Sequence, residues 1–240
     1  MVNTLTTTRS VKGREHQDRT DGRSRRWRVH REKRRTELLK LAREAIAERG
    51  AGASMSEIAA QCRTSKSVFY RYFDDKDGLK RELAEYVVGR MGRRMAEAAA
   101  EAGSFEETVR ELVVQYLGQI EHSPEVYRFV VSGAAPQGES PVDRFCQAVA
   151  QLLVDARRRH AVAGQRIPEA DEQYWAAGVV GLVRGAGEAW MRALPPADAG
   201  EAPAASRDEG PEQGGRPPLE DFVETVTAWV LTGTRPPGPR

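Results

Sequence analysis

Cysteine is scarce in this chain of 240 residues. The two cysteines, Cys62 and Cys146, lie far apart and occur in none of the short Cys/His spacings that zinc sites use. They provide neither a disulfide framework nor a metal site, and this usage suits a reducing cytoplasm. We therefore expect a protein with no bound metal and no cofactor.

Long apolar runs are also missing. No stretch of about 18 apolar residues occurs, because Arg184, Glu188 and Arg192 interrupt the most apolar segment. No apolar segment follows the basic start of the chain, as a secretory signal would require. We therefore expect a cytoplasmic protein that is neither secreted nor inserted in a membrane.

Catalytic motifs are a third absence. The four histidines are scattered along the chain at His16, His30, His122 and His160. No serine, cysteine or acidic residue stands in a nucleophile or phosphate-binding motif. Because no pattern supports catalysis, we expect a protein that is not an enzyme.

Positive charge is present but unevenly distributed. The net charge is only +2, yet residues 1–35 carry twelve lysines and arginines against four acidic residues, which leaves the remainder at −6. A basic end on a mildly acidic body is typical of a protein that faces nucleic acid at one end. Because residues 1–30 have few periodic apolar positions, we expect a disordered basic arm there. Its arginines on either side of Trp27 could insert into a DNA minor groove.

The most informative stretch is residues 54–76, which read SMSEIAAQCRTSKSVFYRYFDDK. Ser54 and Glu57 form a capping-box pattern, which begins a short helix at about Met55. The helical period stops at residues 62–65, and a second short pattern then ends in aromatic and basic residues. Two short helices with a tight break are typical of a helix-turn-helix, whose second helix lies in the DNA major groove.

The second helix has an apolar and a polar face. Thr64 or Ser65 can cap it, and we expect it to run through Phe73, with Val68, Phe69 and Phe73 facing inward. Lysine, serine and arginine on the other face can donate to guanine and phosphate acceptors, and tyrosine hydroxyls can bond phosphates. The candidate DNA contacts are Ser56, Thr64, Ser65, Lys66, Ser67, Tyr70, Arg71, Tyr72 and Lys76.

These residues resemble the DNA-binding domain of TetR-type transcriptional regulators. The resemblance rests on LLKLAREAIAERG at 38–50, Ile58-Ala-Ala, the run from Thr64 to Phe73, Lys76 and Leu79. It covers roughly residues 34–86. It implies a three-helix DNA-binding domain over 31–76 and a helical ligand-binding and dimerisation domain over 77–240.

One turn position departs from the family pattern. Where the family usually has glycine, this chain has Arg63. The left-handed backbone conformation expected there must therefore be adopted by a residue with a Cβ.

Amphipathic patterns continue through the rest of the chain, so we expect an all-α fold. A stripe at four-residue spacing predicts one long helix over 76–100 that joins the two domains. Its members are Leu79, Leu83, Val87, Met91 and Met95. Further helices are predicted from Phe105 to near Ser123, over 125–131, from Ser140–Pro141 to the arginines at 157–159, and over 168–194 and 219–231. The proline- and glycine-rich residues 195–218 should form a flexible insertion.

The last two helices are candidates for a dimer interface. Gly178, Gly181 and Gly185 each weaken the helix over 168–194 by about 1 kcal/mol, so we expect another helix to approach closely there. The resemblance implies that this helix and that over 219–231 meet their copies in a second subunit as a four-helix bundle. Such a two-fold dimer would place two reading helices about one DNA turn apart, ~34 Å.

An effector pocket is expected among the middle helices. Its aromatic candidates are Phe105, Tyr116, Tyr127, Phe129, Phe145, Trp175 and Trp190. Their apolar character favours a small hydrophobic or aromatic effector.

Together these patterns predict a ligand-responsive regulator of transcription. We expect a repressor that binds a partly palindromic operator in double-stranded DNA as a homodimer and is released by its effector. The alternative is a helical adaptor that binds protein through the helix-turn-helix surface. A DNA affinity that falls steeply with salt separates the two.

Overall fold

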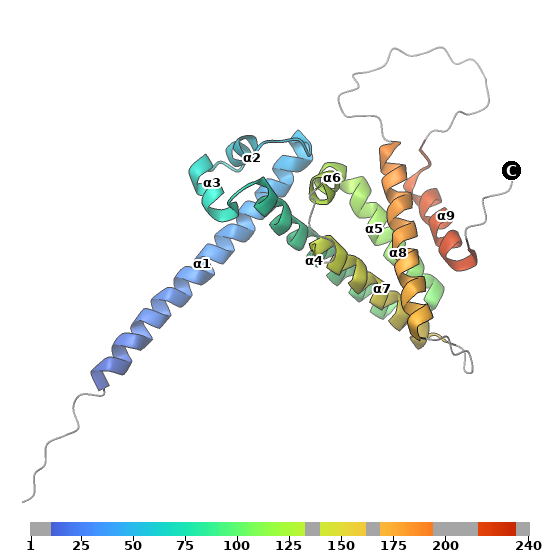
Figure 1. Cartoon of the computed structure of the whole chain (residues 1–240), viewed down its shortest axis with the longest axis horizontal. Coiled ribbons are helices and arrows are strands. Elements are labelled where there is room, and N and C mark those ends of the chain that lie inside the picture. The colour runs from blue at the N-terminus through green and yellow to red at the C-terminus, as the bar shows by residue number, and fades with distance from the viewer. Residues whose placement is uncertain (1–10, 133–139, 162–168, 194–215, 234–240) are drawn as a thin grey trace, which may run out of the picture.

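The computed structural model describes residues 11–132, 140–161, 169–193 and 216–233, with side chains from residue 27 onward. Within these ranges every regular element is a helix, which confirms the all-α prediction (Figure 1). The helices are α1 (Val11–Arg49), α2 (Met55–Gln61), α3 (Lys66–Phe73), α4 (Lys76–Glu101), α5 (Phe105–His122), α6 (Pro124–Val131), α7 (Pro141–Arg159), α8 (Glu169–Arg192) and α9 (Leu219–Thr232). In this part of the chain no helix is both long and apolar enough to span a bilayer.

Helix α1 is much longer than the sequence predicted. It begins at Val11 and projects away from the body (Figure 1), so the expected disordered arm is wrong for residues 11–30. Residues 1–10 lie outside the described ranges. The segment 11–30 contains no proline, and extending a helix that has already formed adds hydrogen bonds without a new nucleation cost.

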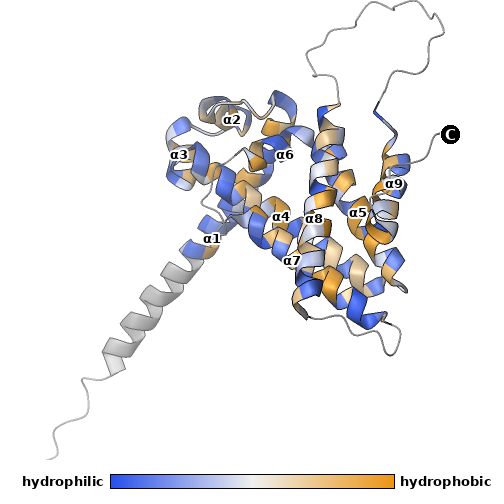
Figure 2. Cartoon of the chain, turned by 45° about the vertical axis from the view of Figure 1, so that its right-hand side comes forward, coloured by the Kyte–Doolittle hydropathy of each residue, from blue (hydrophilic) through white to orange (hydrophobic). Residues whose placement is uncertain are grey.

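The helices surround two separate hydrophobic cores. The first lies among the C-terminal half of α1, α2, α3, the first turns of α4, and α6. It extends beyond residue 76, because Leu79 and Leu83 are fully buried in it and α6 adds Val126 and Phe129. The second lies among the C-terminal half of α4 and α5, α7, α8 and α9. Figure 2 shows the hydrophobic residues of α5 and α9 gathered in this second unit.

Helix α7 has a capped start and is tied to α4 and α8 at its C-terminal end. The expected start is confirmed, because Ser140 Oγ accepts a hydrogen bond from Asp143 N (3.0 Å) and Pro141 follows the cap. The arginines at its other end contact the neighbouring helices. Arg159 donates to Ala99 O of α4 (2.8 Å), and Arg158 pairs with the buried carboxylate of Glu172 on α8 (2.9 Å).

Three glycines of α8 face open space in the described part of the chain. A Cβ at Gly178, Gly181 or Gly185 would meet nothing within 4 Å. The close approach occurs instead at Gly187, where a Cβ would come within 3.0 Å of Tyr116 on α5. The expectation of close packing at the three outer glycines is therefore wrong within one subunit.

The end of the predicted insertion is anchored to the body. Arg216 lies over the ring of Trp190 (3.3 Å to the centroid) and donates to Glu121 (3.0 Å). Trp190 Nε1 donates to Pro217 O (3.0 Å). Residues 216–218 are therefore held in place, whereas 195–215 lie outside the described ranges.

Candidate nucleic-acid interface and effector cavity

The start of α2 is fixed by reciprocal hydrogen bonds. Ser54 Oγ accepts from Glu57 N (3.3 Å), and Glu57 Oε2 accepts from Ser54 N (2.8 Å). This confirms the predicted capping box. The same hydrogen bonds lower the pKa of the Glu57 carboxyl.

The turn between α2 and α3 is a Schellman motif with arginine in the left-handed position. Arg63 has φ 50°, as expected for the position where the family usually has glycine. Arg63 N donates to Ala60 O (3.0 Å) and Thr64 N to Ala59 O (3.1 Å), which satisfies the last carbonyls of α2. The turn geometry is thus retained, although a residue with a Cβ is strained there.

Helix α3 is anchored by a serine cap and two buried rings. Of the two predicted caps, Ser65 is used, because its Oγ accepts from Val68 N (3.3 Å). Phe69 and Phe73 are fully buried and meet edge to face at 4.8 Å. Their predicted inward direction is confirmed.

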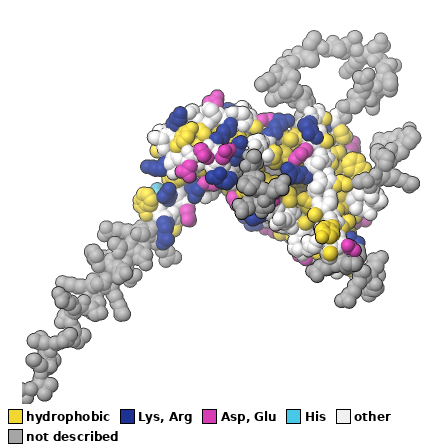
Figure 3. Space-filling view, in the orientation of Figure 1, with side chains coloured by type: hydrophobic (Ala, Val, Ile, Leu, Met, Phe, Trp, Pro, Cys, Tyr) yellow, Lys and Arg dark blue, Asp and Glu magenta, His cyan; other side chains and the backbone are white. Residues whose placement is uncertain are grey.

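The opposite face of α3 is exposed and basic. Ser56, Ser65, Lys66, Ser67, Tyr70 and Arg71 are exposed, and Thr64 is half-buried. Lys66 Nζ lies 5.7 Å from the ring centroid of Tyr70. Within the described ranges neither Lys66 nor Arg71 forms an ion pair with a carboxylate. Figure 3 shows lysine and arginine side chains spread over this end of the molecule.

Two of the predicted DNA contacts are placed differently. Tyr72 is half-buried and packs against the first core, so its expected outward direction is wrong for the ring. Lys76 is half-buried, donates to Gly52 O (3.2 Å), and lies 5.6 Å from the ring centroid of Phe129. Its ammonium group is therefore engaged within the protein and is not free as predicted.

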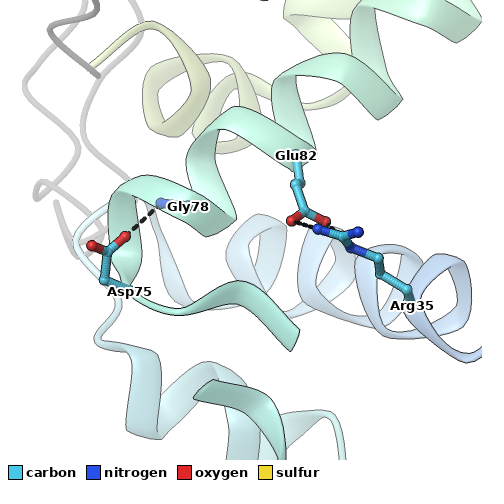
Figure 4. A network of polar contacts seen from close by, with 4 residues as sticks. All are labelled: Arg35, Asp75, Gly78 and Glu82. Atoms are coloured by element: carbon cyan, nitrogen blue, oxygen red, sulfur yellow. Dashed lines mark hydrogen bonds and ion pairs between the residues drawn. The ribbon is translucent and has the colours of Figure 1, made fainter. Parts of the chain in front are cut away.

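Helix α4 is held to α1 by a contact that the sequence did not reveal. Arg35 donates through two nitrogens to the carboxylate of Glu82, and this hydrogen bonding raises the pKa of the guanidinium (Figure 4). Asp75 caps the same helix by accepting from Gly78 N (2.6 Å). The start of α4, which directly follows α3, is thus fixed to the first helix.

The second unit contains an apolar cavity of about 90 Å³ among α4, α5, α6, α7 and α8. Its walls are mostly aliphatic, with valines from all five helices. Of the seven predicted lining residues, Tyr116, Tyr127 and Phe145 do line it. Within the described part of the chain, these three are the only aromatic residues in the cavity wall.

The other four candidates belong to the packed interior, so their predicted place in the cavity wall is wrong. Phe129 is fully buried in the first core. Phe105 and Trp175 face each other at 5.9 Å, and Trp190 stacks on Phe222 at 5.3 Å. These four rings pack between helices and do not line the apolar cavity.

A polar network lies beside this cavity. Tyr116 and Tyr127 share a hydrogen bond (3.0 Å), and Tyr127 donates to Glu188 Oε1 (2.9 Å), which also accepts from Arg184 Nε (3.0 Å). Burial raises the pKa of both tyrosines, that of Tyr127 to about 12. Arg184 lines the cavity but was not among the candidates. The sequence feature that could have identified Arg184 is its position as a charged residue within the most apolar segment.

Helix α6 connects the cavity to the first core. Tyr127 and Val130 line the cavity, Phe129 is buried in the first core, and Val126 borders both. At its start, Glu125 Oε2 accepts from Ala51 N in the α1–α2 loop (2.8 Å). One short helix therefore contacts both units.

Comparisons with known proteins agree with this architecture. Residues 38–83 match the family model described as bacterial regulatory proteins, tetR family. Two helix-turn-helix-type transcriptional regulators from two strains of Mycobacterium tuberculosis are each 36% identical over 180 residues, which is 72% of this chain and 74% of theirs.

Solved structures share the fold over most of the chain. FadR from Bacillus subtilis, solved in complex with stearoyl-CoA, has a TM-score of 0.62 at 15% identity over 83% of this chain and 99% of its own. A TetR-family regulator from Pectobacterium atrosepticum has a TM-score of 0.60 at 21% identity over 87% of this chain and 95% of its own. The similarity thus covers both units and not only the N-terminal motif.

Proposed function

Because the chain belongs to the tetR family of bacterial regulatory proteins, we propose that it is a ligand-responsive repressor of transcription. It binds a partly palindromic operator as a homodimer in the cytoplasm and leaves the DNA when a small hydrophobic effector fills the cavity. The observation that carries DNA binding is the exposed basic face of α3, which stands on two fully buried phenylalanines.

The roles on α3 follow from exposure and chemistry. Lys66 and Arg71 are exposed cations that can donate to guanine or phosphate acceptors. Ser67 and the hydroxyl of Tyr70 can bond phosphate oxygens, which positions the helix without reading sequence. Because Ser65 caps α3 and its ring anchors are buried, these side chains stand on a rigid support.

Helices α8 and α9 support the two-fold dimer. Gly178, Gly181 and Gly185 form an open face on α8, and Tyr174 on the same helix is 77% exposed. Three glycines cost a helix about 1 kcal/mol each, and no described residue of the same subunit uses the close approach that they permit. Packing against a second copy would use it and would cover the half-buried Trp229 of α9.

Helix α6 supports the coupling between effector and DNA. A ligand that enlarges the cavity pushes on Tyr127 and Val130, and α6 carries this displacement to Phe129 in the first core. Because that core also supports α3 and the start of α4, the reading helix is re-aimed. The effector must bind the DNA-incompetent conformation more tightly, with a typical coupling of about 1 to 3 kcal/mol.

Selection of bound fragments from a random DNA pool tests this function. We expect enrichment of a two-fold symmetric site whose half-sites lie about one helical turn apart. Affinity for that site should fall steeply with salt, because phosphate contacts release counterions. A pool that yields no enriched sequence, or an affinity indifferent to salt, would contradict DNA recognition and favour a protein-binding role for this surface.

A further inference from the structure

A second hollow lies directly beside the effector cavity. This basic groove, of about 280 Å³, is lined by Arg43 of α1, by Arg90 and Arg94 of α4, and by His122 of α5, among others. Arg93 and Arg94 continue the positive charge into a neighbouring hollow, whose lining includes one carboxylate, that of Glu97.

The basic groove and the apolar cavity have walls in common. Val87 and Met91 of α4 and Gln119 of α5 line both. No more than one layer of side chains therefore separates an aliphatic interior from an arginine-lined surface. Met91 and Gln119 are unbranched, so a change of rotamer can open a passage between the two.

The arginines of the basic groove lack an anionic partner within the described part of the chain. Arg90 donates to the hydroxyl of Tyr86 (3.1 Å), and none of Arg43, Arg90 and Arg94 forms an ion pair with a carboxylate there. Like charges four residues apart on a helix, as at Arg90 and Arg94, repel each other. A bound polyanion would relieve this repulsion.

We propose that the effector is an amphiphile, with an aliphatic chain in the apolar cavity and a phosphate-bearing head group in the basic groove. This rests on the proposed function, because it specifies the ligand of the same cavity. The valine-rich walls suit an alkyl chain. Guanidinium groups bind phosphate oxygens bidentately, and several cations in one groove match a head with more than one negative charge.

The position of Arg43 links this ligand to DNA binding. Arg43 belongs to α1, whose buried side carries the first core, whereas Arg90 and Arg94 lie on α4 in the second unit. A head group held by both helices fixes their relative placement. The same ligand thus acts on α6 through its aliphatic chain and on α1 through its phosphate-bearing head group.

The test compares dodecyl phosphate, dodecan-1-ol, dodecyltrimethylammonium and inorganic pyrophosphate by calorimetric titration of the full chain without DNA. Dodecyl phosphate should bind at least about tenfold more tightly than the alcohol, and pyrophosphate and the cationic amphiphile should bind more weakly than either. In Arg90→Ala/Arg94→Ala the preference for phosphate should fall to within about threefold while affinity for the alcohol stays unchanged. The matched control is Arg81→Ala, an exposed arginine of α4 outside the basic groove.

The outcomes separate this proposal from the proposed function. Equal affinity for phosphate and alcohol, an unchanged preference in the double variant, or no binding of dodecyl phosphate would overturn the assigned ligand class. Pyrophosphate binding as tight as that of dodecyl phosphate would also overturn it, because the alkyl chain of the ligand would then contribute nothing to the affinity. DNA binding is measured separately, so its loss would refute the repressor role without altering these titrations.

Discussion

Tyr127 and Phe129 lie two positions apart on α6 and point into different parts of the molecule. Tyr127 lines the effector cavity of the second unit, whereas Phe129 is fully buried in the core that supports α3. In the proposed mechanism, a displacement of one side chain reaches the other through a single turn of helix. Helix α6 thus borders both the cavity and the first core, as α4 does through Val87.

Truncating Phe129 should affect both stability and DNA binding. Phe129→Ala removes a fully buried ring from the first core and should lower the free energy of unfolding by about 3 to 5 kcal/mol. Urea denaturation measures that loss, and DNA affinity should fall with it. Phe105→Ala, which truncates a half-buried ring packed against the second core, should leave DNA affinity at low temperature unchanged. If both variants lower DNA affinity equally, the proposed role of α6 in coupling the cavity to DNA binding is wrong.

Lys76 and Lys66 should give opposite signatures. Lys76→Ala removes the hydrogen bond to Gly52 O and should lower the free energy of unfolding by about 0.5 to 1.5 kcal/mol, with no change in the salt dependence of DNA binding. Lys66→Ala should leave stability unchanged and reduce the salt slope by about 1. Arg81→Ala serves as the control and should do neither. A reduced salt slope in Lys76→Ala would instead show that Lys76 contacts DNA phosphate, as the sequence predicted.

Arg63→Gly should stabilise the protein. Glycine adopts the left-handed conformation without the Cβ strain of roughly 1 to 2 kcal/mol, and its larger unfolded-state entropy offsets part of that gain. We therefore expect a net stabilisation of about 0.5 to 1 kcal/mol, measured by thermal or urea unfolding. Ala60→Gly, in a helical conformation on α2, should instead destabilise by about 1 kcal/mol. A loss of stability in Arg63→Gly would mean that the arginine side chain supports the turn.

Alkaline pH should weaken the first core through Cys62. Burial raises the pKa of this thiol from 9.0 to about 11, so the folded state holds its proton where the unfolded state loses it. The free energy of unfolding should therefore fall as pH rises between about 9 and 11. Denaturation measured at several pH values across this range should show a weaker pH dependence of the free energy of unfolding in Cys62→Ala. An identical slope in that variant would show that other groups cause the decline.

Local patterns predicted much of the fold because their causes are local. Ser54 with Glu57, and Ser140 followed by Pro141, mark helix starts through hydrogen bonds that span only three residues. Arg63 was predicted to adopt a left-handed conformation because the turn requires it, and φ is 50°.

The cavity could not be resolved from the sequence in the same way. Periodicity shows that Tyr116 and Trp190 face inward, but only the packing of other helices decides whether space remains beside them. Trp190 meets Phe222 from a helix about thirty residues later, whereas Tyr116 borders the cavity. For the same reason the sequence does not show which helix approaches the glycines of α8, because the close packing at Gly187 depends on where α5 lies.

The length of α1 has a consequence for measurements in solution. Its 39 residues make a rod of about 58 Å, and about 36 Å of that helix precedes the contact of Arg35 with Glu82 of α4. A particle with such a spike diffuses and elutes like a heavier one. Subunit stoichiometry should therefore be taken from light scattering or sedimentation equilibrium, since a column calibrated with compact standards would overstate the mass of a lone chain.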